Sequence, residues 1–294
     1  MTGEASLHEP VSRVGVIGCG VMGAGIADIA ARAGLDVRVV VSRPEAVAPA
    51  LDRVRGSLGR CVRKGRLTEA ERDDALARVE VSADLERLAD REFVIEAVPE
   101  DEELKTALFA RVDGILKDEG AVLATNTSSL PISRLARATH HPQRVIGVHF
   151  FSPVPVMSLV ELVSALPTSE QTRTRTAELL TGPLGKSVVD APDRAGFMVN
   201  GLLIPYLLGA MRMLESGRVS AEAVDRGMTL GCGHPVGPLR LADLIGLDVI
   251  KAVADALHRE FAEPQYLAPT MLLRLVESGM LGKKTGRGFH TYDG

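Results

Sequence analysis

The sequence predicts an α/β fold, with a doubly wound, mostly parallel sheet followed by a smaller, all-helical C-terminal domain. Three observations favour this class. A glycine motif joins an apolar strand directly to a helix near the N-terminus. Strand-length apolar runs then alternate with helical patterns as far as residue 191, and beyond Asp193 the apolar residues recur only at helical spacing. We therefore predict two domains, residues 1–191 and residues 192–294.

The first strand and its glycines form the motif around which the first domain is organised. Residues 14–17 are typical of a buried strand, and three glycines follow in the spacing G-x-G-x-x-G before a helical pattern begins. In a dinucleotide site, the first glycine permits a tight turn, the second lets the backbone approach the pyrophosphate, and the third packs the helix close to the strand. The motif predicts a Rossmann-type dinucleotide-binding domain, with the phosphates at the N-terminus of the helix. The predicted contacts are Gly18, Gly20, Val21, Met22 and Gly23.

The second strand, residues 37–41, ends without the acidic residue that holds the ribose hydroxyls in NAD-binding domains of this type. The chain continues Val41, Ser42, Arg43. A hydroxyl and a guanidinium suit a 2′-phosphate by charge and by the fork geometry of arginine. We therefore favour NADP(H) over NAD(H) and include these three residues among the cofactor contacts. A simpler interpretation, which is compatible with this contact, is that Ser42 caps the next helix, with Pro44 in its first turn and Glu45 completing a capping box.

The helix expected over residues 46–67 has one apolar face and one polar, mostly cationic face. Its polar residues step by 4, 3 and 4 positions, which places them on one side of the helix: Arg53, Ser57, Arg60 and Lys64. Such a face suits a phosphorylated ligand that lies along the helix. A basic face in contact with solvent is the alternative, and the pattern alone does not separate the two.

Polar residues also follow the next two strands. The strand over residues 93–98 has Glu96 near its end and leads into Glu100 and a helix that carries Lys105. The strand over residues 121–124 leads into the polar residues 125–129. Open α/β sheets bind ligands at the carboxyl ends of their parallel strands. Helix capping would explain the same acids equally well.

Two later strands each contain one ionisable residue. His149 interrupts the apolar strand at residues 144–151, and Glu161 interrupts the strand at residues 158–163. An ionisable group in a buried strand is costly unless it is paired, so the simplest explanation is that the two residues pair with each other; two independently satisfied residues are the alternative. A carboxylate holds a neutral imidazole in one tautomer and raises its basicity, as a general base requires.

Composition limits the partners of the chain. Over 294 residues the net charge is only −4, which favours neither nucleic acid nor an anionic membrane. No apolar stretch approaches the ~20 residues needed to span a bilayer, and the first ten residues lack the pattern of a secretory signal. The three scattered cysteines, Cys19, Cys61 and Cys232, suit reduced thiols. We expect a cytoplasmic protein without a metal site.

Seven motifs occur in one order between residues 12 and 292. They are GCGVMGAGIA (18–27), IEAVPED with Lys105, ATNTSSLPI (124–132), GVHFFSPVPVMSLVELV (147–163), DRAGFMVN (193–200), HPVGPLRLADLIGLD (234–248) and LGKKTGRGF (281–289). Together they resemble the L-3-hydroxyacyl-CoA dehydrogenase family in its short form, the 3-hydroxybutyryl-CoA dehydrogenases. The resemblance covers nearly the whole chain.

The resemblance implies a reaction and a set of site residues. The reaction is the interconversion of 3-hydroxyacyl-CoA and 3-oxoacyl-CoA, short chains favoured, by hydride transfer to or from a nicotinamide cofactor. The implied catalytic residues are His149, Glu161, Ser128 and Asn200. Glu100, Lys105 and Lys284 resemble cofactor contacts, and Ser57, Lys64 and Ser128 resemble contacts to the CoA substrate. Val41 departs from the family, because it occupies the position of the usual ribose-binding acid.

The resemblance also implies a homodimer, in which residues 192–294 form the substrate and dimerisation domain. Two other functions remain open. One is a dehydrogenase of the same fold that acts on a carrier-bound acyl group or on a small hydroxy or sugar acid. The other is a non-catalytic relative, which the presence of both His149 and Glu161 disfavours.

Overall fold

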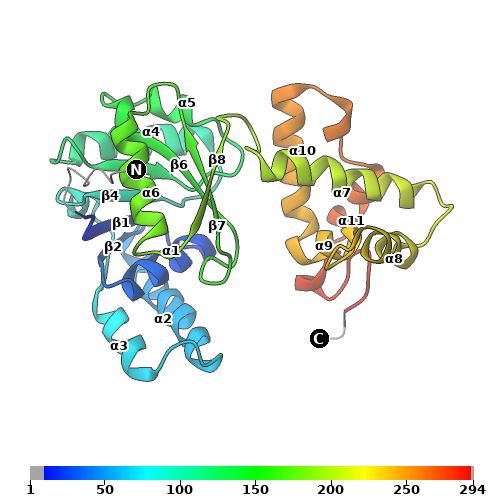
Figure 1. Ribbon diagram of the computed structural model, residues 1–294, viewed down its shortest axis with the longest axis horizontal. Coiled ribbons are helices and arrows are strands. Elements are labelled where there is room, and N and C mark those ends of the chain that lie inside the picture. Colours follow the sequence, from blue (N-terminus) through cyan, green and yellow to red (C-terminus); the bar gives the residue numbers. More distant parts are fainter. Residues whose placement is uncertain (1–9, 293–294) are drawn as a thin grey trace, which may run out of the picture. The chain divides into compact units, whose positions relative to one another are not determined.

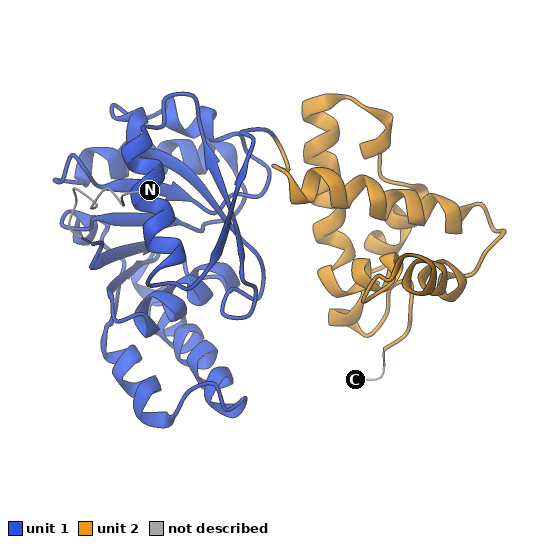
Figure 2. Ribbon diagram, viewed as in Figure 1, with its two compact units in different colours: residues 1–194 blue, residues 195–294 orange. Residues whose placement is uncertain are grey.

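The computed structural model describes residues 10–292. The chain consists of two compact units, divided between Arg194 and Ala195 (Figure 2). The sequence predicts this division slightly earlier, after residue 191. Each unit has its own hydrophobic core, and each is therefore described separately.

Unit 1 is built on one eight-stranded sheet in the order β3-β2-β1-β4-β5-β6-β7-β8 (Figure 1). Only β7 against β6 is antiparallel; the other neighbouring strands of this sheet are parallel. The order reverses between β1 and β4, so the carboxyl ends of these two strands flank the switch point of the sheet. The strands are β1 (Arg13–Ile17), β2 (Asp36–Val40), β3 (Val79–Ser82), β4 (Phe93–Glu96), β5 (Val122–Thr125), β6 (Val145–Phe150), β7 (Leu159–Ser164) and β8 (Ser187–Ala191).

Helices cover both faces of this sheet, and nearly every residue of its central strands is therefore buried. α1 (Val21–Arg32) and α6 (Glu170–Thr181) share a core with alternate residues of the strands. α4 (Glu102–Ile115) and α5 (Ile132–Ala136) pack together, and α5 contacts β6. α2 (Val47–Arg63) and α3 (Glu69–Ala77) pack on α1 and on each other. Three short 3-10 helices complete the unit: η1 (Pro44–Ala46), η2 (Leu85–Leu88) and η3 (Pro142–Arg144).

Unit 2 is helical, and its core includes Leu207, Met211, Leu239 and Leu257. Buried Asp243 accepts hydrogen bonds from the backbone N–H groups of Phe289 and His290, which fixes the C-terminal segment against α9. The elements are α7 (Val199–Glu215), α8 (Ala221–Cys232), α9 (Pro238–Ile245), α10 (Leu247–Phe261), η4 (Pro264–Tyr266), α11 (Thr270–Glu277) and η5 (Lys283–Thr285). Within residues 10–292, none of the helices combines the length and the apolar character that crossing a bilayer requires.

The fold class predicted from the sequence is confirmed, with one strand missed. β3 falls in a stretch that the sequence presents as a connection between helical segments. Its four residues, VEVS, pair on one side only, with β2 at the edge of the sheet, and are mostly half-exposed. Such a short edge strand carries neither the continuous apolar run of a buried strand nor a long alternation.

Candidate active site

The glycine turn lies at the carboxyl end of β1, beside the switch point. Gly18 has a φ of +88°, and a Cβ there would lie 2.7 Å from the carbonyl oxygen of Ala97. A Cβ on Gly23 would clash with the carbonyl oxygen of Gly18, whereas a Cβ on Gly20 would meet nothing within 4 Å in the described structure. No side chain of residues 10–292 caps the start of α1 at Gly20. The turn therefore leaves the first N–H groups of α1 open, as a dinucleotide pyrophosphate requires.

The residues after β2 lie beside the glycine turn, because Gly18 N donates a hydrogen bond to the carbonyl oxygen of Val40 at 2.8 Å. Val41 is buried and packs in the core, while Ser42 and Arg43 are exposed. The alternative in which Ser42 caps the next helix is wrong. The N-cap of η1 is Arg43, which has an extended backbone, and within the described part of the chain no side chain caps this turn. The turn begins one residue later than a capping box starting at Ser42 would need.

A buried ion pair occupies the carboxyl end of β4. The Glu96 side chain is fully buried and accepts hydrogen bonds from Lys105 Nζ at 2.7 Å and from Thr125 Oγ1 at 2.7 Å. The Lys105 side chain is only 1% exposed, and its Nζ also lies 3.3 Å from Glu100 Oε2. The Lys105 ammonium is thus held between two carboxylates. Its predicted contact with the cofactor stays a prediction.

Glu100 joins the loop after β4 to the loop after β5. Its Oε1 accepts hydrogen bonds from the Thr127 hydroxyl at 2.5 Å, from Ser128 N at 2.9 Å and from Ser129 N at 3.0 Å. Burial raises the pKa of Glu100, but the Lys105 charge and these hydrogen bonds outweigh burial and hold the pKa below its usual value. An ionised Glu100 therefore fixes the backbone that carries Ser128.

The sheet register brings His149 and Glu161 together. The two residues are direct cross-strand partners on antiparallel β6 and β7, and His149 Nδ1 lies 2.7 Å from Glu161 Oε2. Glu161 is fully buried and His149 is 5% exposed; the imidazole also contacts the Phe151 ring, with 4.6 Å between centroids. Because β6 is parallel to β5, His149 lies at the same edge of the sheet as the glycine turn and the Ser128 loop.

Comparison with known protein families agrees with this geometry. A model of the 3-hydroxyacyl-CoA dehydrogenase NAD binding domain matches residues 13–194, and a model of the C-terminal domain of 3-hydroxyacyl-CoA dehydrogenase matches residues 196–292. The chain belongs to the 3-hydroxyacyl-CoA dehydrogenase family. The resemblance predicted from the sequence motifs is confirmed, and so is the prediction that the protein is a nicotinamide-dependent dehydrogenase.

Individual members of the 3-hydroxyacyl-CoA dehydrogenase family are similar over almost their full length. A 3-hydroxybutyryl-CoA dehydrogenase of Mycobacterium tuberculosis is 51% identical over 97% of this chain and 100% of its own length. A probable 3-hydroxybutyryl-CoA dehydrogenase of Bacillus subtilis is 41% identical over 96% of this chain and 98% of its own. The crystal structure of (S)-3-hydroxybutyryl-CoA dehydrogenase PaaH1 from Ralstonia eutropha superposes with a TM-score of 0.89 at 43% identity, covering 97% of this chain and 100% of that one.

The structure corrects the position of Ser57 relative to the cationic face of α2. Arg53, Arg60 and Lys64 are exposed, but Ser57 is buried and donates its hydroxyl to Asp28 of α1 at 2.5 Å. Ser57 lies where α2 packs on α1, and its hydroxyl satisfies a buried carboxylate there. The contacts with CoA that family resemblance implies for Ser57 and Lys64 stay predictions.

Two of the residues that family resemblance assigns lie in unit 2. Asn200 is the second residue of α7 and is partly buried. Lys284 lies in η5, where its Nζ is 2.6 Å from one carboxylate oxygen of Asp248 and 2.7 Å from the other. Their predicted contacts with substrate and cofactor are not tested by these interactions.

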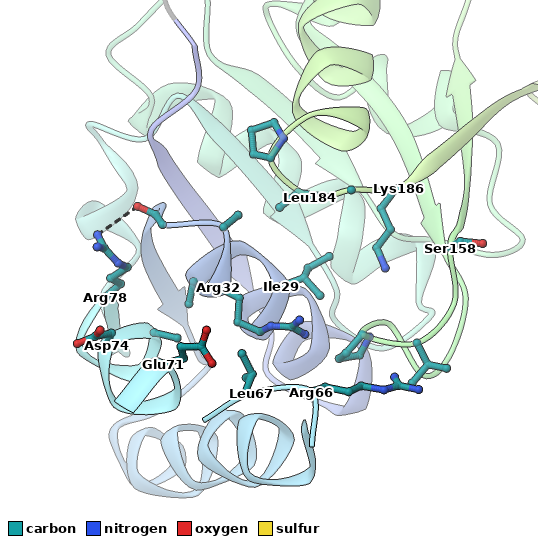
Figure 3. A pocket seen from close by; sticks show the side chains of 18 of the residues that line it. Ile29, Arg32, Arg66, Leu67, Glu71, Asp74, Arg78, Ser158, Leu184 and Lys186 are labelled. Carbon is teal, nitrogen blue, oxygen red and sulfur yellow. Dashed lines mark hydrogen bonds between the residues drawn. The ribbon is translucent and has the colours of Figure 1, made fainter. Parts of the chain in front are cut away.

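A separate cavity of about 690 Å³ lies at the carboxyl-terminal end of α1 (Figure 3). Its lining includes Arg32, Arg66, Glu71, Met157 and Lys186. It includes none of the site residues that the sequence analysis predicts. The cavity is therefore separate from the predicted site at the carboxyl edge of the sheet.

Sequence reasoning missed two residues that hold the predicted site residues or their neighbours in place. Glu96 appears in the sequence only as an acid at a strand end, and Asn126 appears only as part of a polar loop. In the structure Glu96 is the buried partner of Lys105, and the Asn126 side chain accepts a hydrogen bond from Phe150 N at 2.9 Å, beside His149. Glu96 could have been found by the rule that identified His149, because it too is an ionisable residue within a buried strand.

Proposed function

We propose that this protein interconverts 3-hydroxyacyl-CoA and 3-oxoacyl-CoA, with 3-hydroxybutyryl-CoA as a favoured substrate and His149 as the general base and acid. The observation that carries the proposal is the 2.7 Å contact between His149 Nδ1 and Glu161 Oε2 at the carboxyl edge of the sheet. The full-length similarity to 3-hydroxybutyryl-CoA dehydrogenases supports the choice of substrate.

His149 supplies the proton chemistry of the proposed reaction. With the Nδ1 proton donated to Glu161, the lone pair of the neutral ring lies on Nε2, which accepts the proton of the substrate 3-hydroxyl. The buried Glu161 carboxylate orients the ring and stabilises the imidazolium that results. In the reducing direction the imidazolium returns the proton to the 3-oxo oxygen. The bound nicotinamide supplies hydride transfer at the same substrate carbon.

Ser128 and Asn200 position the substrate in this proposal. The hydroxyl of Ser128 is carried by a loop that Glu100 holds through two backbone N–H groups, its own and that of Ser129. A fixed hydroxyl suits hydrogen bonding to the substrate oxygen or the thioester carbonyl, because a small misplacement costs as much as ~10²-fold in rate. Asn200 is assigned to the same task on family resemblance.

We further propose that NADP(H) is preferred over NAD(H). Val41 supplies no acceptor for the ribose hydroxyls, and its side chain is buried in the core. Ser42 and Arg43 are exposed immediately after it, and the structure gives Ser42 no capping role. A guanidinium and a hydroxyl at this position favour a 2′-phosphate.

The proposed assembly follows from family resemblance, and the proposed location follows from the three scattered cysteines, which suit reduced thiols. We propose a homodimer in which unit 2 supplies the substrate and dimerisation surfaces, and a cytoplasmic location. The exposed leucines of unit 2 are consistent with such a surface, because Leu202 is 72% exposed and Leu230 is 74% exposed.

An initial-rate matrix tests the substrate and cofactor together. The purified full-length protein is assayed with 3-oxobutyryl-CoA, a longer 3-oxoacyl-CoA, a carrier-protein thioester and a free 3-oxo acid, each with NADPH and with NADH. The proposal predicts the highest kcat/KM for 3-oxobutyryl-CoA with NADPH. A higher kcat/KM for the carrier-protein thioester or the free acid would show that this compound, and not the CoA thioester, is the preferred substrate. A higher kcat/KM with NADH than with NADPH would reject the proposed cofactor preference alone.

A further inference from the structure

The buried acid at the end of β4 has no role in the mechanism described above. Glu96 is fully buried, and its Oε1 accepts hydrogen bonds from Lys105 Nζ at 2.7 Å and from Val98 N at 2.6 Å. Its Oε2 accepts a hydrogen bond from Thr125 Oγ1 at 2.7 Å. Both oxygens are thus engaged by groups from three segments around the carboxyl end of β4: the loop after β4, helix α4 and the end of β5.

Lys105 transmits the position of Glu96 to Glu100. The side chain of Lys105 is 1% exposed, and its single ammonium faces Glu96 Oε1 at 2.7 Å and Glu100 Oε2 at 3.3 Å. Glu96 and Glu100 therefore compete for one cation. If Glu96 lost its charge, the ammonium would be attracted to Glu100 alone, and Glu100 would be drawn away from its other partners.

Those other partners belong to the loop that carries the proposed substrate contact. Glu100 Oε1 receives the Ser128 N–H at 2.9 Å, the Ser129 N–H at 3.0 Å and the Thr127 hydroxyl at 2.5 Å. The hydroxyls of Ser128 and Ser129 also donate to this oxygen, at 3.4 Å and 2.9 Å, so that five donors from three consecutive residues converge on it. A shift of Glu100 toward Lys105 therefore moves the Ser128 backbone with it.

We propose that Glu96 is a positioning residue for the dehydrogenase reaction, which acts through Lys105 and Glu100 to set the place of Ser128. The inference rests on the proposed role of Ser128. It predicts that Glu96→Gln lowers kcat about ten- to a hundredfold, because the rate is sensitive to small displacements of a positioned group.

A double-mutant cycle separates this role from a purely structural one. The variants are Glu96→Gln, Ser128→Ala and the pair together, with kcat for 3-oxobutyryl-CoA reduction and the melting temperature as readouts. If Glu96 acts through Ser128, the Glu96→Gln change costs less than about twofold once Ser128 is alanine. If Glu96→Gln lowers kcat by the same factor with Ser128 present as with alanine at position 128, the proposal is overturned.

Asp113→Asn provides a matched control in the same unit. Asp113 and Arg144 form an ion pair at 2.7 Å whose side chains are 1% and 3% exposed, but neither residue contacts the Ser128 loop through any hydrogen bond among the described residues. This variant lowers the melting temperature and leaves kcat below that temperature unchanged, with or without Ser128→Ala. An equal loss of kcat in Asp113→Asn and Glu96→Gln would contradict the proposal.

Two further outcomes keep the test decisive. If Glu96→Gln does not fold, Glu96→Asp is the second variant. It keeps the negative charge but moves it away from Lys105 by the length of one methylene. It is predicted to show the same coupling with Ser128→Ala at a smaller loss of kcat. If Ser128→Ala alone leaves kcat and KM unchanged, the proposed role of Ser128 fails. If Ser128→Ala lowers kcat but the losses from the two changes multiply in the double variant, only the positioning role of Glu96 is rejected.

Discussion

The catalytic proposal depends on two side chains that are expensive to bury singly. A buried carboxylate without a partner carries a large desolvation penalty, and Glu161 is fully buried. The penalty is offset by the short contact with His149, which the cross-strand register of β6 and β7 imposes. The same contact therefore satisfies the buried carboxylate and fixes the orientation of the imidazole.

Cofactor preference is also decided at the residue scale. Arg43→Ala is predicted to lower kcat/KM for NADPH by about tenfold or more, because a hydrogen bond to a charged group is lost. The value for NADH should hardly change. Steady-state kinetics with both cofactors measure the ratio. Arg55→Ala is the matched control, since Arg55 is an exposed arginine of α2 that pairs with Asp52. Equal effects of both variants, or no effect of Arg43→Ala, would reject the 2′-phosphate contact.

At the scale of elements, the contact between α1 and α2 contains a buried acid. Burial raises the pKa of Asp28 above its usual value. The Ser57 hydrogen bond and the charge of Arg32 lower this pKa, but their effect is smaller than that of burial. One of its carboxylate oxygens, Oδ1, has no hydrogen-bond partner in the described structure, and its ion pair with Arg32 is long, at 3.7 Å. The ionised acid is therefore unfavourable in the folded state. Its cost is greatest above the raised pKa and absent below the pKa of an unfolded aspartate.

Asp28→Asn is therefore predicted to raise the melting temperature at pH 7, with a gain that shrinks as the pH falls toward 4. Asp113→Asn should show the opposite sign. Burial raises the pKa of Asp113, but Arg144 and the backbone of His140 outweigh burial and hold the pKa below its usual value, so this ionised acid stabilises the fold at neutral pH. Thermal melts between pH 4 and pH 8 compare the two variants with the parent protein. A lower melting temperature for Asp28→Asn at pH 7 would contradict the argument.

The elements also show which features the sequence could predict. Continuous apolar strands with one ionisable residue each predicted the pairing of His149 with Glu161, because burial leaves such residues few partners. The Ser57 hydroxyl was misplaced, because helical spacing gives the side of a helix but not what packs against it. Helix capping by Ser42 was wrong by one residue, a shift that local sequence does not determine. The link from Glu96 to Ser128 depends on the order of β4 and β5 in the sheet, which no local pattern contains.

The whole molecule provides two units with separate cores, and the proposed dimer can be tested on the intact chain. Light scattering at micromolar concentration is predicted to give twice the chain mass of 31.3 kDa. Leu230→Glu should lower this mass, because Leu230 is a large exposed apolar residue of unit 2. Leu166→Glu should not, since Leu166 is a fully exposed leucine of unit 1. A monomer mass for the parent protein would reject the dimer.

The role of His149 is tested most directly by His149→Ala in the full-length protein. Reduction of 3-oxobutyryl-CoA is followed at the nicotinamide absorbance, and binding of the reduced cofactor is followed by its fluorescence. We predict that kcat falls by about 10²- to 10⁴-fold, the contribution of a general acid or base, while cofactor affinity and melting temperature remain close to those of the parent protein. A His149→Ala variant that turns over at the parent rate would contradict the mechanism.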